Sequence, residues 1–128
     1  MRILVVEDTL IARTMLERTL RKWGYQVDSV SNSHDAMQCL IKEAIQIVIT
    51  DWVMPGGDGP SLCREIRAQN FPYYTYIVLV TSLEGAESAI QGLESGADDF
   101  VRKPIQLDEL HARIRAGERV LALENLIS

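Results

Sequence analysis

Short apolar runs alternate five times along the chain with longer stretches in which apolar residues recur at helical spacing. The runs have the length of β-strands, and the stretches have the length of amphipathic helices. Five successive strand–helix units are typical of an α/β domain built on a parallel sheet. The predicted strands are Ile3–Val6, Gln26–Val30, Ile47–Thr50, Tyr76–Val80 and Asp99–Arg102. The predicted helices are Ile11–Trp23, Asp35–Glu43, Ser61–Ala68, Gly85–Glu94 and a last helix from Leu107 onward.

The polarity of the strands predicts their order in the sheet. The first, third and fourth strands are apolar without interruption, as strands covered on both faces must be. The second and fifth strands contain polar residues and suit the two edges. Numbered along the chain, the strands are therefore expected in the order 2-1-3-4-5, which describes a flavodoxin-like (βα)5 three-layer sandwich.

Helix ends and helix faces add local detail. Gly24 and Gly96 follow predicted helices and suit left-handed C-caps. Pro60 is expected at the first position of the third helix, where its missing N–H costs nothing. In the second helix, Met37 and Ile41 are expected to face the core together.

Composition limits the classes of function. The chain has 128 residues, 47% of them hydrophobic, which fits one domain with a core of ordinary size. It carries 13 Lys+Arg against 18 Asp+Glu, a net charge of -5, which argues against binding to nucleic-acid phosphates. No apolar run approaches the ~20 residues that span a bilayer, so we expect a cytoplasmic protein. Cys39 and Cys63 lie in predicted helices and match neither a disulfide framework nor a zinc-binding spacing.

Reactive polar residues stand where the predicted strands end. They are Glu7 and Asp8 after the first strand, Asp51 after the third, Thr81 and Ser82 after the fourth, and Lys103 after the fifth. Each has an ordinary explanation, since acidic and hydroxyl residues cap helices and a lysine is often a solvated surface charge. The carboxyl ends of parallel strands, however, meet at one edge of the sheet, where ligands bind in such folds. Capping alone would seldom gather three carboxylates, a hydroxyl and an ammonium there, so we interpret these residues as one site.

The three carboxylates indicate a divalent cation. Neighbouring carboxylates raise one another's pKa values unless a cation shares their site. Oxygen ligands, without any His or Cys at zinc spacing, favour Mg²⁺, which binds one or two carboxylates together with phosphate oxygens. Such an ion also neutralises charge on a phosphoryl group that an aspartate attacks as nucleophile. The sequence therefore predicts a Mg²⁺ site that handles phosphoryl groups.

The set Glu7-Asp8, Asp51, Thr81 and Lys103-Pro104 resembles the receiver domain of bacterial two-component response regulators, the CheY-like receivers. The resemblance extends over nearly the whole chain. It includes the segments Asp51-Trp52-Val53-Met54-Pro55, Asp58-Gly59 and Gly96-Ala97-Asp98-Asp99-Phe100. Several spaced motifs in the right order make the resemblance specific. It implies a phosphorylation-dependent signalling switch in a phosphorelay, that is, a phosphoacceptor domain and not an enzyme.

The resemblance also implies roles for these residues. Asp51 would accept the phosphoryl group from a phosphohistidine on a sensor histidine kinase or a phosphotransfer protein, forming an aspartyl phosphate. The implied Mg²⁺ ligands are Glu7, Asp8, Asp51 and the backbone carbonyl of Val53. The implied phosphoryl-binding groups are Lys103, Thr81 and the backbone N–H groups of Val53 and Ser82. His34 and His111 lie away from the strand ends and are expected to be surface or packing residues.

The implied switch residues are Thr81 and Phe100. Thr81 would bind the phosphoryl group, and Phe100 would turn inward in response. The bond between Lys103 and Pro104 is expected to be cis. The readout would be the face of the fourth helix, fifth strand and fifth helix, which would control a partner protein, an output domain or homodimer formation.

Four residues depart from the commonest form of the family. Glu7 stands where aspartate is more usual, and Phe100 lacks the hydroxyl of a tyrosine. Val53 and Leu83 are apolar and cannot position a water molecule for hydrolysis. We therefore hypothesise a long-lived phosphoryl group.

The end of the chain suggests a connection to another domain. Residues 1–120 are assigned to the receiver domain, and 121–128 to an extension of the last helix toward an output domain, for example a diguanylate cyclase or a phosphatase. Leu110, Ile114, Gly117 and Leu121 have heptad-like spacing. The alternative is a helix that frays after about Leu121.

Three other functions are weighed against the receiver. A haloacid-dehalogenase-type phosphatase needs a second aspartate two residues after the nucleophile, where Val53 stands, and a cap domain. A flavin site needs a Ser/Thr/Gly-rich loop after the first strand, where the chain is acidic at Glu7 and Asp8. A receiver-like binding module that works without phosphorylation stays as the alternative, although the presence of Asp51, Thr81 and Lys103 lends it no positive support.

Overall fold

Five parallel strands form one sheet in the order β2-β1-β3-β4-β5, which confirms the predicted order. The computed structural model describes residues 1–82 and 86–127. The strands are β1 (Arg2–Val6), β2 (Gln26–Val30), β3 (Ile47–Asp51), β4 (Tyr76–Thr81) and β5 (Asp99–Arg102). The helices are α1 (Leu10–Lys22), α2 (Ser33–Lys42), α3 (Gly59–Ala68), α4 (Ala86–Glu94) and α5 (Leu107–Ile127). The predicted start of the fourth helix, Gly85, lies outside the described residues.

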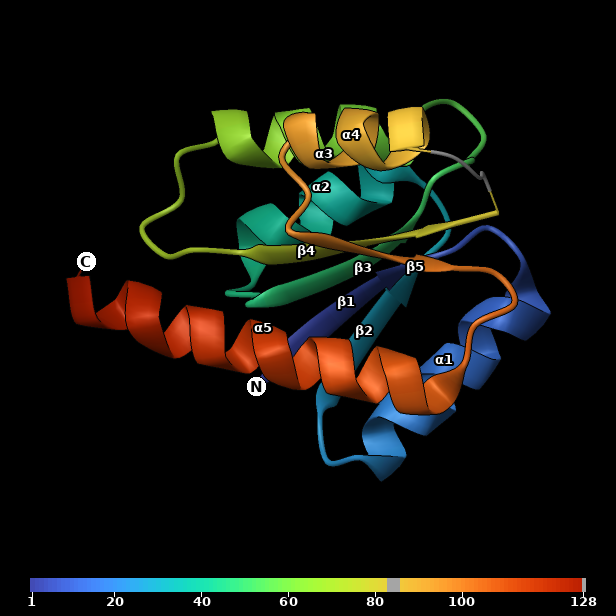
Figure 1. Ribbon diagram of the computed structural model, residues 1–128, viewed down its shortest axis with the longest axis horizontal. Helices are drawn as coiled ribbons and strands as arrows, with labels where there is room; N and C mark the ends of the chain where they lie inside the picture. Colours follow the sequence, from blue (N-terminus) through green and yellow to red (C-terminus); the bar gives the residue numbers. More distant parts are fainter. Residues whose placement is uncertain (83–85, 128) are drawn as a thin grey trace.

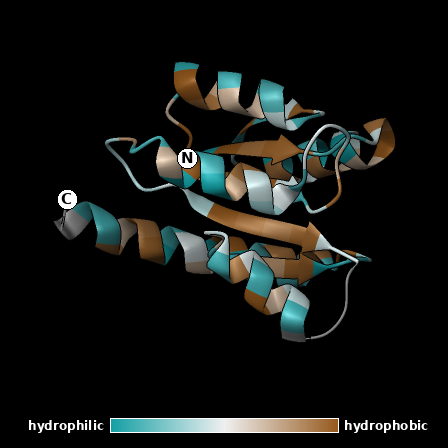
Figure 2. Ribbon diagram, turned by 90° about the horizontal axis from the view of Figure 1, so that it is seen from above, coloured by the Kyte–Doolittle hydropathy of each residue, from teal (hydrophilic) through white to brown (hydrophobic). Residues whose placement is uncertain are grey.

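Helices cover both faces of the sheet (Figure 1). α2, α3 and α4 lie on one face, and α1 and α5 lie on the other (Figure 1). Successive side chains of a strand point to opposite faces. Leu4 and Val6 accordingly join the core under α2 and α3, whereas Ile3 and Val5 join the core under α1 and α5. The central strands β1, β3 and β4 are mainly hydrophobic, while the helices carry both kinds of residue (Figure 2).

Two helical details differ from the predictions. Ile41 is 60% exposed, because the buried stripe of α2 passes through Met37 and Leu40, and the next residue is turned about 100° away from it. α3 begins at Gly59 with Asp58 as its N-cap, so Pro60 occupies the second helical position and not the first. The side chain of Asp58 accepts a hydrogen bond of 2.8 Å from the backbone N–H of Ser61. This cap sets the earlier start of the helix.

The last helix packs on the sheet along most of its length. Leu110, Ile114 and Leu121 are buried in the same core as the inner residues of α1. A Cβ added at Gly117 would lie 2.7 Å from the ring of Tyr76, so the helix approaches β4 closely there. The heptad-like spacing is therefore accounted for by packing within the domain. α5 continues as a helix to Ile127.

Ion pairs and hydrogen bonds close the amino-terminal edge of the sheet. Arg67 of α3 donates to Asp98 at 2.9 Å and to the carbonyls of Gly96 and Thr75 at 2.9 and 2.7 Å. Asp98 also accepts hydrogen bonds from the hydroxyl of Tyr74 and, at 2.8 Å, from the N–H of Ile77. This network joins α3 to the residues that enter β4 and β5.

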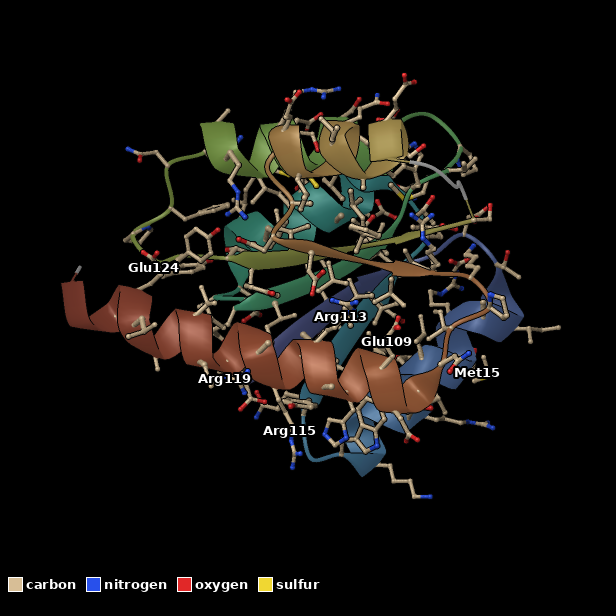
Figure 3. The ribbon with its side chains drawn as sticks, in the orientation of Figure 1. Met15, Glu109, Arg113, Arg115, Arg119 and Glu124 are labelled. Carbon is tan, nitrogen blue, oxygen red and sulfur yellow. The ribbon has the colours of Figure 1, made fainter. Side chains whose placement is uncertain are left out.

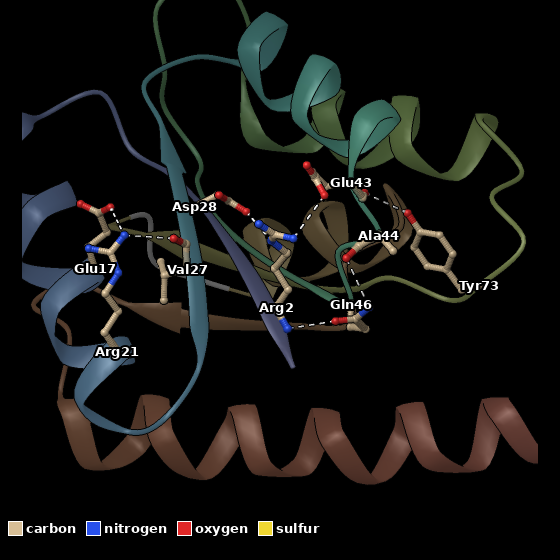
Figure 4. Close-up of polar contacts among 9 residues, drawn as sticks. All are labelled: Arg2, Glu17, Arg21, Val27, Asp28, Glu43, Ala44, Gln46 and Tyr73. Carbon is tan, nitrogen blue, oxygen red and sulfur yellow. Dashed lines mark hydrogen bonds and ion pairs between the residues drawn. The ribbon is translucent and has the colours of Figure 1, made fainter.

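A second group of polar contacts joins β1 to its neighbours at the same edge (Figure 4). Arg2 pairs with Asp28 of β2 at 2.7 Å and with Glu43, just after α2, at 3.2 Å. Its backbone N–H donates to Gln46 at 2.9 Å. In the described residues, no helix is both long and apolar enough to cross a membrane.

Candidate functional site

Asp51 occupies the carboxyl end of the central strand β3. Its neighbours in β3 are buried on both sides of the sheet, and Asp51 itself is only 6% exposed. One carboxylate oxygen, Oδ1, accepts the backbone N–H of Trp52 at 3.0 Å. The other, Oδ2, accepts the ammonium group of Lys103 at 3.0 Å. The central position in the sheet therefore gives a recessed carboxylate whose two oxygens have different partners.

Two further carboxylates approach Asp51 from the turn between β1 and α1. One carboxylate oxygen from each of Glu7, Asp8 and Asp51 lies within 4.8 Å of the others. Glu7 is 5% exposed, whereas Asp8 is exposed. Glu7 accepts the backbone N–H of Thr9 at 3.1 Å. The predicted cluster is thus brought together by the end of β1 and the end of β3.

The environment of Glu7 disfavours its charge. Burial raises the pKa of Glu7, the hydrogen bond from Thr9 opposes this, and the nearby carboxylate of Asp51 raises the pKa further. A divalent cation among these oxygens would reverse that balance. The donor set contains carboxylate oxygen and neither imidazole nor thiolate, so it fits Mg²⁺.

The ends of β4 and β5 contribute the hydroxyl and the ammonium group. Thr81 is 3% exposed and pairs with Arg102 in the sheet. The backbone N–H of Lys103 donates to the carbonyl of Thr81 at 2.8 Å, which carries the pairing one residue beyond β5. The bond between Lys103 and Pro104 is cis, as expected. Ser82 is exposed beside Thr81.

The loop after β3 approaches Asp51 very closely at Gly59. The N–H of Gly59 donates to the carbonyl of Trp52 at 2.7 Å. A Cβ at this position would lie 2.6 Å from the backbone oxygen of Asp51 and 2.7 Å from the side chain of Leu79. Only glycine fits there without moving the backbone, which explains its place in the motif. Val53, in the same loop, is 67% exposed at the rim of the site.

Phe100 lies on the edge strand β5 and is half-buried. The guanidinium carbon of Arg102 stands 5.3 Å from the centre of the Phe100 ring, a cation–π geometry. Trp52 and Leu79 line the space next to Phe100. A Cβ at Gly92 of α4 would lie 2.9 Å from Leu79 and 3.1 Å from Trp52. Trp52, the residue that follows Asp51, therefore packs against α4.

Sequence reasoning missed two contributors to the site. Arg13, in the first turns of α1, donates from its guanidinium to the backbone carbonyls of Glu7 at 2.9 Å and Asp8 at 3.5 Å. Its position as the first basic residue after the acidic pair was the signal available. The second contributor is the backbone N–H of Trp52, which no sequence pattern could indicate, because every residue except proline has a backbone N–H group. His111 stacks on Trp23 with ring centres 4.0 Å apart, as a packing residue.

Comparisons with known proteins agree with this geometry. The family model of the response regulator receiver domain matches residues 3–115. A solved protein described as a response regulator from Chloroflexus aurantiacus is 31% identical, with 91% of this chain and 95% of that chain covered and a TM-score of 0.82. The receiver domain of Francisella response regulator 1452 is 28% identical, with 93% and 98% covered and a TM-score of 0.86.

A third solved relative is longer than this chain. It is a two-component system response regulator/GGDEF domain protein, 29% identical, with a TM-score of 0.88. The match covers 95% of this chain and 50% of that one.

Proposed function

This chain belongs to the response regulator receiver domain family, and on that premise we propose that it is a switch operated by phosphorylation of Asp51. The observation that carries the proposal is the recessed Asp51 carboxylate, with the Lys103 ammonium 3.0 Å from one oxygen and the carboxylates of Glu7 and Asp8 beside it. A nucleophile, a cation and a set of metal-binding oxygens are the groups that phosphoryl transfer to a carboxylate requires.

In the proposed reaction, a carboxylate oxygen of Asp51 attacks the phosphorus of a phosphohistidine on a sensor kinase or phosphotransfer protein. An O–P bond forms as the N–P bond breaks. The imidazole leaves neutral when its other ring nitrogen carries a proton. The low exposure of Asp51 would limit the access of water to the carbonyl carbon of the acyl phosphate that results.

The other residues would bind the transferred group. Lys103 already reaches an oxygen of Asp51, so it is within reach of an oxygen bonded to that carboxylate. Thr81 would donate its hydroxyl to a second phosphoryl oxygen, and the N–H groups of Val53 and Ser82 would bind the others. Mg²⁺, held by Glu7, Asp8, Asp51 and the carbonyl of Val53, would neutralise negative charge on the transferring group.

The proposed donor surface is the apolar rim next to the site. Leu10, Ile11 and Met15 of α1 are 65%, 80% and 54% exposed. Met15 projects from α1 beside the start of α5 (Figure 3). It lines a cavity of about 390 Å³ whose wall also includes Glu7 and Lys103 of the site. Because Asp51 is recessed, the donor would have to bring its histidine close to the site, and the exposed side chains beside this cavity would offer it a contact area.

The proposed readout is the surface of α4, β5 and α5. Phe100 would turn inward as Thr81 engages the phosphoryl group, shifting an existing equilibrium between two packings. Arg113 of α5, labelled in Figure 3, points toward the sheet. It pairs with both carboxylate oxygens of Asp99, each at 3.0 Å, and so ties α5 to the residue before Phe100. The longer relative with a GGDEF domain supports an output domain as the target of the change, and α5 would be the element that passes the change on.

The test is intact mass after incubation with a small acyl phosphate, with and without Mg²⁺. We expect one phosphoryl group on the parent protein in Mg²⁺ and none in chelator. Asp51→Asn should stay unmodified, while Asp108→Asn, which removes an exposed carboxylate of α5, should behave as the parent does. A parent that stays unmodified would contradict the proposal and favour a binding module that works without phosphorylation.

The lifetime of the phosphoryl group is a separate part of the proposal. The exposed, apolar Val53 offers no group that could orient an attacking water. The second apolar residue of the prediction, Leu83, lies outside the described residues. We expect Val53→Asn to shorten the half-life of the phosphorylated protein, followed by mass after the donor is removed. An equal or longer half-life in the variant would contradict this part alone.

A further inference from the structure

Arg13 contacts the turn that carries two of the three clustered carboxylates. Its side chain is half-buried, and its Nη1 donates to the carbonyl oxygen of Glu7 at 2.9 Å. The same nitrogen lies 3.5 Å from the carbonyl oxygen of Asp8. The guanidinium group therefore contacts the two peptide units from which the carboxylates of the turn project.

The backbone of Arg13 takes part in the same turn. Its N–H donates to the carbonyl of Thr9 at 2.9 Å, and the N–H of Thr9 donates to the carboxylate of Glu7 at 3.1 Å. Thr9 is the N-cap of α1, yet its side chain makes no capping hydrogen bond. The helix thus lacks the usual side-chain device for fixing its entry, and the Arg13 side chain supplies a connection between helix and turn.

The position of Asp8 is the one that depends most on this connection. Glu7 is buried, and its N–H is anchored to the carbonyl of Val30 in β2 at 3.0 Å. Asp8 comes after the end of β1 and is exposed. An exposed carboxylate on a short turn can adopt several orientations, so restraint of its backbone reduces the entropy lost when it binds an ion.

We propose that Arg13 is a positioning residue of the Mg²⁺ site, which holds the turn at Glu7 and Asp8 in the conformation that binds the ion. The inference rests on the proposed function, since it assumes that the acidic cluster binds Mg²⁺. It assigns to Arg13 no contact with the ion or with the phosphoryl group. Groups that orient metal ligands in this way commonly contribute about tenfold or more to metal affinity.

The sign of the effect separates positioning from plain electrostatics. Arg13 carries a positive charge close to a cation site, so Coulomb repulsion alone predicts that its removal strengthens Mg²⁺ binding. Loss of positioning predicts the opposite, that removal weakens binding.

The experiment measures the Kd of Mg²⁺ by titration calorimetry on the full chain. We expect Arg13→Gln to weaken binding about tenfold. Arg18→Gln removes the same charge from an exposed position further along α1 and should leave the Kd within about twofold of the parent value. Arg13→Lys keeps the charge, but its ammonium nitrogen is one bond closer to the backbone than Nη1, which makes both contacts in the parent, so its Kd should fall between those of the parent and Arg13→Gln.

A readout at saturating Mg²⁺ completes the test. If Arg13 only positions the ligands, phosphorylation of Arg13→Gln by the acyl phosphate should need more Mg²⁺ for half-maximal rate but reach about the parent's maximal rate. Binding by Arg13→Gln as tight as that of Arg18→Gln would overturn the inference. If Arg13→Gln does not fold, a Kd for Arg13→Lys equal to that of the parent overturns it instead. A parent that binds no Mg²⁺ would contradict the proposed function itself.

Discussion

Charged side chains are paired differently at the two edges of the sheet where the strands begin (the amino edge) and where they end (the carboxyl edge). At the amino edge, Arg67 has Asp98 and two backbone carbonyls as partners, and Asp98 in turn accepts from three donors. At the carboxyl edge, the carboxylates of Glu7, Asp8 and Asp51 lie close together, and the ammonium group of Lys103 pairs with Asp51. The first edge is electrostatically satisfied, and the second carries an excess of negative charge.

This difference separates stability from function within one small domain. Charged side chains that are paired with one another and hydrogen-bonded to the backbone stabilise the fold. They have no free donor or acceptor with which to bind a ligand. An acidic cluster costs stability in the absence of a cation, and for the same reason it binds one. The following predictions disturb one edge at a time, in order of decreasing effect.

Arg67→Met should have the largest effect on stability. It leaves Asp98, whose side chain is only 17% exposed, without its cation, and it frees the carbonyls of Gly96 and Thr75. We expect the free energy of unfolding, measured by urea denaturation, to fall by about 3 kcal/mol. Arg64→Met is the control on the same helix, because Arg64 is exposed and makes one long contact of 3.4 Å to Ser61.

The folded fraction of Arg67→Met should bind Mg²⁺ with the parent's affinity, because the network lies at the opposite edge. Equal losses of stability in the Arg67 and Arg64 variants would contradict the role assigned to the amino edge.

Removal of Mg²⁺ should have the next largest effect. An ion that binds only the folded state at about a hundred times its Kd adds about 2.7 kcal/mol to the free energy of unfolding. We expect chelator to lower the melting temperature of the parent accordingly, and to change that of Asp51→Asn much less. A shift of the same size in both proteins would place the stabilising ion elsewhere.

Glu7→Gln should stabilise the Mg²⁺-free protein by about 1 kcal/mol. Glutamine keeps an acceptor for the N–H of Thr9 and removes a buried charge that burial and Asp51 both disfavour. Glu65→Gln, on the exposed side of α3, is the control and should change stability by less than about 0.5 kcal/mol. Urea denaturation in chelator measures both, and a loss of stability in Glu7→Gln would show that the cluster is not under repulsion.

Tyr25→Phe should have the smallest effect, visible only in alkali. Burial and the hydrogen bond to Glu118 raise the pKa of Tyr25 to about 12 from its ordinary value of 10.0. The unfolded chain therefore loses this proton at lower pH than the folded protein. Stability from this phenol is present below pH about 10 and is lost as the pH rises toward about 12.

We expect the stability of Tyr25→Phe to fall less steeply than that of the parent across this interval, as measured by urea midpoints. Tyr73→Phe is the control, since the hydroxyl of Tyr73 makes one contact of 3.4 Å to the carbonyl of Glu43. Parallel curves for parent and Tyr25→Phe would contradict the shift.

The sequence by itself determined the order of the strands and the members of the acidic cluster. Continuous apolar runs identify the central strands β1, β3 and β4, because a strand covered on both faces excludes polar residues on either side. Once the strands are parallel and ordered, their carboxyl ends must meet at one edge. Glu7, Asp8, Asp51 and Lys103 stand at or just after those ends in the chain, so their meeting was predictable.

Tertiary structure alone decided which contacts complete the site. The bond from Arg13 to the turn depends on how α1 leaves β1, and the closeness of Gly59 to Asp51 depends on the path of a loop. The burial of Leu121 depends on how α5 lies on the sheet, although its spacing also suited a coiled coil. Sequence patterns repeat with the period of a helix or strand and so predict which side of an element is apolar. They do not predict the distance between two elements, because that distance depends on how the side chains of both elements pack together.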